Sequence, residues 1–162
     1  MVNFFHEAVS IEILGSSSKV TEVEVLVGGQ WVPGPSPPGK ITSASADVLD
    51  KDVYLFGGQG SSKSMAIYVL RQKSNYWERL PASLYQPRAS HASLVINQSG
   101  KRFQIDVKFN HNLVYLVGGE GENYVEQFVK NGSKTRVIKS IKHSNRLYSA
   151  VTVLPSNVCN QI

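Results

Sequence analysis

The chain has 162 residues, of which 41% are hydrophobic and 18% charged, and its formal net charge is +5. This length suffices for one domain with a hydrophobic core, and this composition excludes an intrinsically disordered chain. No stretch approaches about 18 consecutive apolar residues, and the first residues lack the basic start and apolar run of a secretory signal, so we expect no membrane span and no signal peptide.

The predicted elements are short strands along the whole chain. Each is rich in β-branched or aromatic residues and is bounded by Gly, Pro, Asn or Ser. No window has the apolar stripe of an amphipathic helix, and the proline-rich residues 33–40 form a stiff connector. The fold is therefore predicted to be all-β. In chain order the predicted strands are residues 9–14, 21–27, 52–56, 65–70, 91–96, 102–107, 113–117, 124–129, 136–141 and 147–154.

Residues 52–64 raise the possibility of a nucleotide site, because a strand is followed by glycines and then by a Lys-Ser pair. A P-loop needs Gly-x-x-x-x-Gly-Lys-[Ser/Thr] followed by a helix. Counted from Gly57, the second glycine position holds Ser62, and residues 65–70 are β-branched and aromatic where that helix would begin. The corresponding later loop has two acidic residues and no lysine. We therefore predict a turn between strands here.

The sequence contains an internal repeat. DVYLFGG at residues 52–58 matches LVYLVGG at residues 113–119, and RASHASLVI from residue 88 matches RLYSAVTVL from residue 146. A weaker early copy aligns Trp31 with Trp77, each shortly followed by proline. Residues 97–112 lengthen the later unit and are predicted to be an inserted hairpin. A repeat of about 45–50 residues with four strands is typical of a β-propeller blade.

The pattern resembles the kelch repeat, in which Arg-x-x-His, an apolar strand ending in Gly-Gly, a Trp-bearing strand and Leu-Pro follow one another. The resemblance implies an all-β fold, an incomplete kelch-type β-propeller with about two to three four-stranded antiparallel blades. Glycine is needed where the backbone turns tightly or approaches another chain segment, and the tryptophans are expected to fill space between adjacent sheets. The repeat residues are Gly57, Gly58, Gly118, Gly119, Trp31, Trp77, Arg88 and His91.

The chain departs from the kelch pattern at several positions. Leu70 and Phe128 stand where tyrosine is usual, Thr135 stands where tryptophan is expected, and Gly15 is single rather than paired. We divide the chain into a degenerate blade at residues 1–38, a blade at 39–86, a blade at 87–142 with its inserted hairpin at 97–112, and the start of a further blade at 143–162. Because propellers typically have four to eight blades, we expect a fragment of a larger propeller; self-association that completes the propeller and a free-standing incomplete propeller are the alternatives.

No catalytic residue, metal site or cofactor is predicted, and we expect the protein not to be an enzyme. No serine lies in Gly-x-Ser-x-Gly, and Cys159 is the single cysteine, which excludes a disulfide within the chain and a cysteine zinc site. This favours the cytoplasm, whereas glycosylation sequons at Asn97 and Asn131 would suit an extracellular protein. The histidines lack metal-ligand spacing, and His91 is expected to be structural; they are His6, His91, His111 and His143.

The resemblance implies a non-catalytic protein–protein interaction module that binds an unidentified protein partner through its loops. The alternative is a truncated propeller enzyme or carbohydrate-binding domain of the galactose-oxidase-like class. Residues 127–162 hold six basic and no acidic side chains, which we interpret as a solvated strand face rather than a nucleic-acid site, with polyanion binding as a third hypothesis. The loop candidates for binding are Gln59, Ser61, Lys63, Glu120, Glu122 and Asn123.

Overall fold

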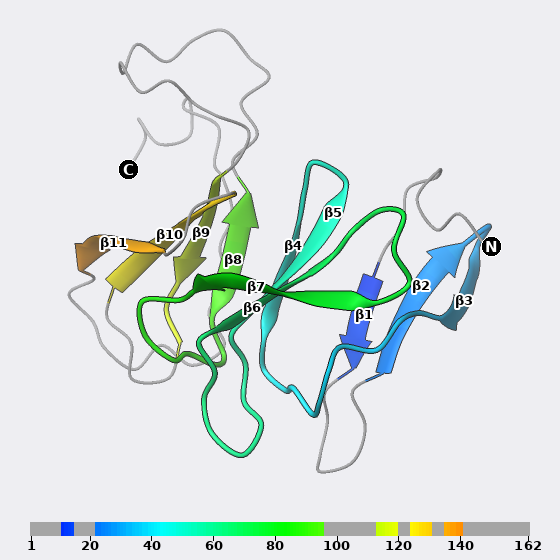
Figure 1. The fold of residues 1–162 in the computed structure, drawn as a ribbon, viewed down its shortest axis with the longest axis horizontal. Coiled ribbons are helices and arrows are strands. Elements are labelled where there is room, and N and C mark those ends of the chain that lie inside the picture. Colours follow the sequence, from blue (N-terminus) through cyan, green and yellow to red (C-terminus); the bar gives the residue numbers. More distant parts are fainter. Residues whose placement is uncertain (1–10, 15–21, 96–112, 120–123, 131–134, 141–162) are drawn as a thin grey trace, which may run out of the picture.

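The computed structural model describes residues 11–14, 22–95, 113–119, 124–130 and 135–140, and all of its regular elements in these ranges are β-strands. The prediction of an all-β fold is confirmed (Figure 1). In chain order the strands are β1 (Ile11–Leu14), β2 (Glu22–Val27), β3 (Gln30–Pro33), β4 (Ser45–Leu49), β5 (Asp52–Phe56), β6 (Ala66–Leu70), β7 (Trp77–Ser83), β8 (Ala92–Val95), β9 (Leu113–Val117), β10 (Tyr124–Val129) and β11 (Arg136–Ser140).

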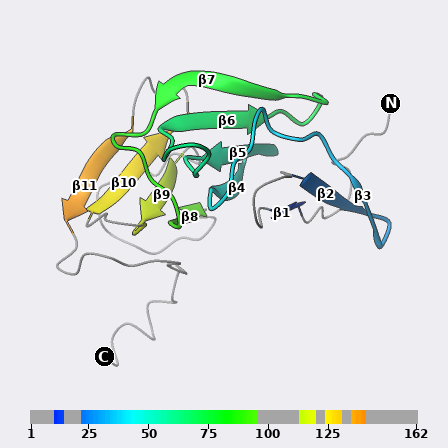
Figure 2. The same cartoon turned by 90° about the horizontal axis from the view of Figure 1, so that it is seen from below.

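The strands form three antiparallel sheets in which sequential strands are neighbours. The first sheet has the order β1-β2-β3, the second β4-β5-β6-β7 and the third β8-β9-β10-β11, and the last two have four strands each. Figure 2 shows the sheets following one another in chain order, with the second sheet between the other two. This is the architecture of an incomplete β-propeller with antiparallel blades, as predicted.

Tight turns set the register of the first two sheets. Asp50 and Lys51 form the two-residue turn between β4 and β5, with φ of 50° and 72°. Gly28 and Gly29 do the same between β2 and β3, with φ of 57° and 81°. Two positive φ values in succession match the right-handed twist of the flanking strands, which is why short hairpins favour them.

The strand β6 follows residues 59–65, and this rules out the helix that a P-loop would need. Gly57 and Gly58 end β5 with φ of 61° and 93°. A Cβ atom on Gly57 would lie 2.5 Å from the carbonyl oxygen of Arg88, and one on Gly58 would lie 2.6 Å from Ile41 Cγ2. The paired glycines are therefore required both by the turn and by the close approach of two other segments.

Three observed strands are absent from the predicted set: β3, β4 and β7. The sequence of β4 is SADVL, and its small and polar residues give a weak strand signal. Its pairing with β5 over five residue pairs forms the strand nonetheless. The predicted strands at 102–107 and 147–154 lie outside the described residues, and the unit boundaries of the sequence analysis stay predictions.

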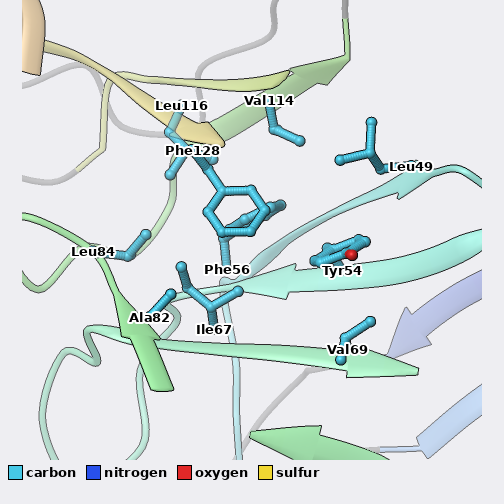
Figure 3. Packing of buried hydrophobic residues seen from close by; sticks show 10 residues of the cluster. All are labelled: Leu49, Tyr54, Phe56, Ile67, Val69, Ala82, Leu84, Val114, Leu116 and Phe128. Carbon is cyan, nitrogen blue, oxygen red and sulfur yellow. The ribbon is translucent and has the colours of Figure 1, made fainter. Parts of the chain in front are cut away.

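A large hydrophobic core lies between the second and third sheets (Figure 3). Phe56 packs edge-to-face on Phe128 with ring centroids 5.4 Å apart, and Tyr54 lies 5.6 Å from the same ring. A second cluster, which includes Val53 and Leu55, covers the other face of β5. Alternate residues of β5 thus enter two cores, so the central blade is buried on both faces. The first cluster comprises Leu49, Tyr54, Phe56, Ile67, Val69, Ala82, Leu84, Val114, Leu116 and Phe128.

The two tryptophans differ in burial, and the expectation that Trp31 fills space between adjacent sheets is wrong. Trp77 is 7% exposed, belongs to the second core cluster and donates its indole N–H to the carbonyl oxygen of Pro35 at 2.6 Å. Trp31 is opposite Leu26 as Trp77 is opposite Leu70, so the two sites correspond in register. Yet Trp31 is 45% exposed, on a strand whose side chains lie mostly in solvent, whereas Trp77 is covered by the segment that carries Pro35.

We expect Trp77→Ala to lower the free energy of unfolding by about 3–5 kcal/mol, because it removes a buried aromatic side chain and its hydrogen bond. Trp31→Ala is the matched control and should cost at most about 1 kcal/mol, since its side chain is half exposed. Urea unfolding of both variants measures the difference. Equal losses in the two variants would contradict the placement of Trp77 in the core.

Candidate functional site

Arg88 lies in the segment between β7 and β8 and is fully buried. Its carbonyl oxygen accepts the N–H of Gly58 at 2.9 Å, and its own N–H donates to the carbonyl oxygen of Ser64 at 3.3 Å. The backbone of Arg88 is thereby fixed on the glycine turn and the loop of the second sheet.

The side chain of Arg88 contacts the third sheet. Nη1 donates to the carbonyl oxygen of Gly118 at 3.1 Å, and Nη2 lies 2.9 Å from Oε2 of Glu126. This second contact is an ion pair in which the N–H does not point along the line to the oxygen. The guanidinium carbon also lies 4.8 Å from the ring centroid of Tyr124, a cation–π distance. One side chain thus joins the two glycine turns and two blades.

Glu126 connects the same region to the outer strands. It lies on β10, is fully buried, and its Oε1 accepts hydrogen bonds from the backbone N–H of Tyr85 and the hydroxyl of Thr135. Thr135 in turn donates its N–H to the carbonyl oxygen of Ser83 at 3.2 Å. A buried ion pair is stable only when further hydrogen bonds compensate for lost hydration, and the two bonds to Oε1 supply part of that compensation, while Nε of Arg88 has no hydrogen-bond partner among the described residues.

His91 is buried and contacts a serine of the preceding sheet. Its Nε2 lies 2.8 Å from the hydroxyl of Ser45, so the pair joins β4, the first strand of the second sheet, to the residue directly before β8, the first strand of the third. Burial, reinforced by the charge of Arg88, lowers the pKa of His91 to about 3. The imidazole is therefore neutral at ordinary pH.

The loop at residues 59–64 is held at its base and exposed at its tip. Gln59 exchanges two backbone hydrogen bonds with Thr42, at 2.7 and 2.8 Å, and also forms a bridge with Lys63. Gln59 and Ser61 are exposed and Lys63 is half-buried, so the structure brings these three predicted residues together. The other predicted binding residues, Glu120, Glu122 and Asn123, lie outside the described residues.

Sequence reasoning missed an aromatic surface beside this loop. Tyr85 is 58% exposed and packs edge-to-face on Tyr124, with ring centroids 6.1 Å apart. The hydroxyl of Tyr124 bonds to Oε1 of Gln86 at 2.9 Å, and the N–H of Leu84 donates to the carbonyl oxygen of Met65 at 2.9 Å. The signal in the sequence was a Tyr-Gln-Pro run directly before Arg88, in a connector rather than a strand.

We call residues 59–65 together with 85–87 the loop face. The β5–β6 loop projects downward in Figure 1, away from the β4–β5 turn at the upper edge, and backbone hydrogen bonds from Leu84 to Met65 and from Arg88 to Ser64 join the two segments. The side chains of Tyr85 and Gln86 contact Tyr124, the backbone N–H of Tyr85 donates to Glu126, and the backbone carbonyl oxygen of Ser64 accepts from Arg88; Tyr124, Arg88 and Glu126 are buried. The loop face is therefore an exposed surface on a packed polar and aromatic base.

Within the described ranges, no group of three or more His, Cys, Asp or Glu side chains comes together where it could hold a metal ion.

Among the same residues, no helix has the length and apolar character needed to span a bilayer.

Comparison with known proteins gives a likeness in fold. No protein-family model and no curated protein matches the chain. The solved structure titled "Structure of YjhT" matches with a TM-score of 0.61 and 13% sequence identity, over 78% of this chain and 47% of that one. The chain thus spans about half the length of YjhT. This likeness to a propeller-type protein supports the β-propeller fold.

We expect the protein to lose stability as the pH falls below about 6.5, partly through His91. The pKa of His91 is lowered from 6.5 to about 3 in the fold, so between these values the unfolded chain binds a proton that the folded chain excludes. The contribution is complete above pH 6.5 and declines with a slope of up to about 1.4 kcal/mol per pH unit.

Urea unfolding at pH 4 to 7.5 measures this slope. His91→Gln, which keeps a polar group for Ser45 but has no proton to gain in this range, should show a shallower pH dependence than the unmodified chain. Identical slopes would contradict the burial of a neutral imidazole at this position.

Proposed function

We propose that the chain is a non-catalytic protein-interaction module of the kelch-repeat type and part of a larger propeller protein, and that it binds its partner through the loop face. The order of Gly-Gly, Trp, Leu-Pro and Arg-x-x-His supports the kelch assignment. The match to 47% of the YjhT chain supports the idea that the blades belong to a larger ring.

The composition of the loop face is the observation that carries the proposal. Tyrosine and methionine are enriched at the centres of protein interfaces, and here Tyr85 and Met65 are 58% and 39% exposed. A tyrosine buries a large area on binding at a small entropy cost. Polar side chains of the same surface, such as Gln59 and Ser61, are exposed and suited to hydrogen bonds at the rim of an interface.

The base of the loop face favours binding without a large rearrangement. The ring of Tyr85 packs edge-to-face on Tyr124, and its backbone N–H donates to the carboxylate of Glu126. A side chain that is already ordered loses little freedom when it binds, so more of its contact energy contributes to affinity. Loops that project from a packed scaffold are a common arrangement for recognition.

We expect Tyr85→Ala to weaken partner binding by roughly ten-fold or more, as truncation of a central interface tyrosine does. The measurement is quantitative cross-linking and affinity capture from cells, with partners ranked by their loss in the variant. Tyr76→Ala is the control, because Tyr76 is 66% exposed and precedes β7, at the other end of its sheet from the β5–β6 loop.

A partner that is lost with Tyr85→Ala, kept with Tyr76→Ala and retained at high salt would support the proposal. Partners lost equally in both variants would contradict it. Capture that consists of polyanions with a steep salt dependence would contradict it too and would favour the basic C-terminal residues as the binding element.

A further inference from the structure

The last strands of the three sheets, β3, β7 and β11, are edge strands. Among the described residues, each of them pairs with one neighbouring strand only. β3 ends in Pro33, and β7 contains Pro81. Proline lacks the N–H that a further strand would bind, so it protects an edge from pairing. β11 has the sequence RVIKS, without proline, and is therefore the most open of these three edges.

The β11 edge exposes apolar side chains. Val137 is 39% and Ile138 is 46% exposed, and β-branched residues of this kind favour strand pairing. Val137 lies opposite Glu126 of β10, whereas Ile138 has no partner there, because a bulge shifts the register between Val137 and Lys139. β11 is the orange strand at the left margin of Figure 1 and of Figure 2, beyond β10. An approaching chain therefore meets exposed apolar side chains beside the unpaired side of the strand.

The β11 edge is held in place by its neighbours. Thr135, directly before β11, donates its N–H to the carbonyl oxygen of Ser83 at 3.2 Å. Nε of Arg136 donates to Oε1 of Gln127 at 2.7 Å, and Nε2 of Gln127 donates in turn to the hydroxyl of Tyr115 at 2.9 Å. A strand that is already ordered loses little conformational freedom when another strand binds to it.

The charge of the β11 edge is positive. Arg136 is exposed, and no ion pair among the described residues includes it. Lys139 lies on the same strand, and residues 127–162 contain six basic and no acidic residues. The acid of β10, Glu126, is buried and paired with Arg88. Two basic edges repel each other, which disfavours pairing between copies of this chain, whereas an acidic strand is attracted.

We propose that the β11 edge binds an extended acidic segment of a partner protein, which adds a fifth strand to the four of the third sheet. The backbone of that segment pairs with the free side of β11, and its Asp or Glu residues lie at the positions of Arg136 and Lys139. Further blades of a larger propeller stack on the faces of the sheets, as the second and third sheets do here, so they leave this edge open. The β11 edge shares no residue with the loop face, so this binding is a second function beyond the one proposed above.

The test is an NMR titration of the full ¹⁵N-labelled chain, at constant ionic strength, with the peptide acetyl-Thr-Val-Glu-Val-Asp-Val-Glu-Thr-amide. We expect saturable shifts and slower hydrogen exchange at the amides of residues 136–140, with a dissociation constant on the order of 100 μM for so short a strand. In one control peptide lysine replaces each acid. In the other all backbone nitrogens are methylated, which keeps the charge and removes the donors for strand pairing. Neither control should give saturable shifts at these amides.

Two variants decide whether the β11 edge itself is responsible. Arg136→Glu should weaken binding of the acidic peptide by roughly ten-fold, because attraction becomes repulsion. Arg79→Glu is its matched control, since Arg79 is an exposed arginine on the edge strand β7 and its replacement changes the net charge equally, and it should leave binding unchanged. Ile138→Pro, checked by thermal melting, should abolish binding, because it gives β11 the protection that Pro81 gives β7.

The absence of saturable shifts, equal binding of either control peptide, or equal weakening by Arg79→Glu and Arg136→Glu would each overturn the proposal. Because Arg136 is exposed, its variant keeps the test decisive even where Ile138→Pro fails to fold. The titration leaves Tyr85 unchanged, so its failure and a failure of the binding proposed for the loop face are distinguishable.

Discussion

The structure depends on one buried cation. Arg88 has no exposed surface, and its guanidinium group reaches a carbonyl oxygen and a carboxylate of the following sheet while its backbone stays bonded to the preceding one. A charge that is removed from water is tolerated only where its partners are fixed. The ion pair with Glu126 therefore does more than add stability. The ion pair sets the spacing and the register of the two successive blades.

The paired glycines and Arg88 form one arrangement. A side chain on Gly57 would overlap the Arg88 carbonyl oxygen at 2.5 Å, and the later glycine Gly118 receives the guanidinium group on its own carbonyl oxygen. The backbone of one turn thus supports the segment that carries Arg88, and the backbone of the next turn binds the Arg88 side chain. Tyr85 lies in the same connector as Arg88, three residues earlier, and its backbone N–H donates to the carboxylate of Glu126. The exposed loop face is consequently positioned by the contact that sets the spacing between blades.

Much of the fold follows from local patterns, and the parts that do not follow have physical reasons. The Tyr-apolar-Gly-Gly motif predicted β5 and β9, because alternation and glycine act over a few residues. The strand β4 was missed because SADVL is weak by itself and forms through pairing with β5. Burial of Trp31 was wrongly predicted, since the burial of Trp77 depends on the segment that carries Pro35, 42 residues away, and similarity between the two tryptophan sites does not reveal that contact. The position of Tyr85 was equally inaccessible, because it depends on Glu126, which is 41 residues away.

The most direct test of this account is a double-mutant cycle on the Arg88–Glu126 pair, followed by urea unfolding. Arg88→Met leaves a buried carboxylate, Glu126→Gln leaves a buried guanidinium group, and the double variant leaves neither charge while the glutamine still accepts the Tyr85 N–H. The account predicts that each single variant is destabilised by about 3–5 kcal/mol and that the double variant recovers at least about 2 kcal/mol of the sum. If the loss of the double variant equals the sum of the two single-variant losses to within about 0.5 kcal/mol, the claim that this pair joins the blades is contradicted.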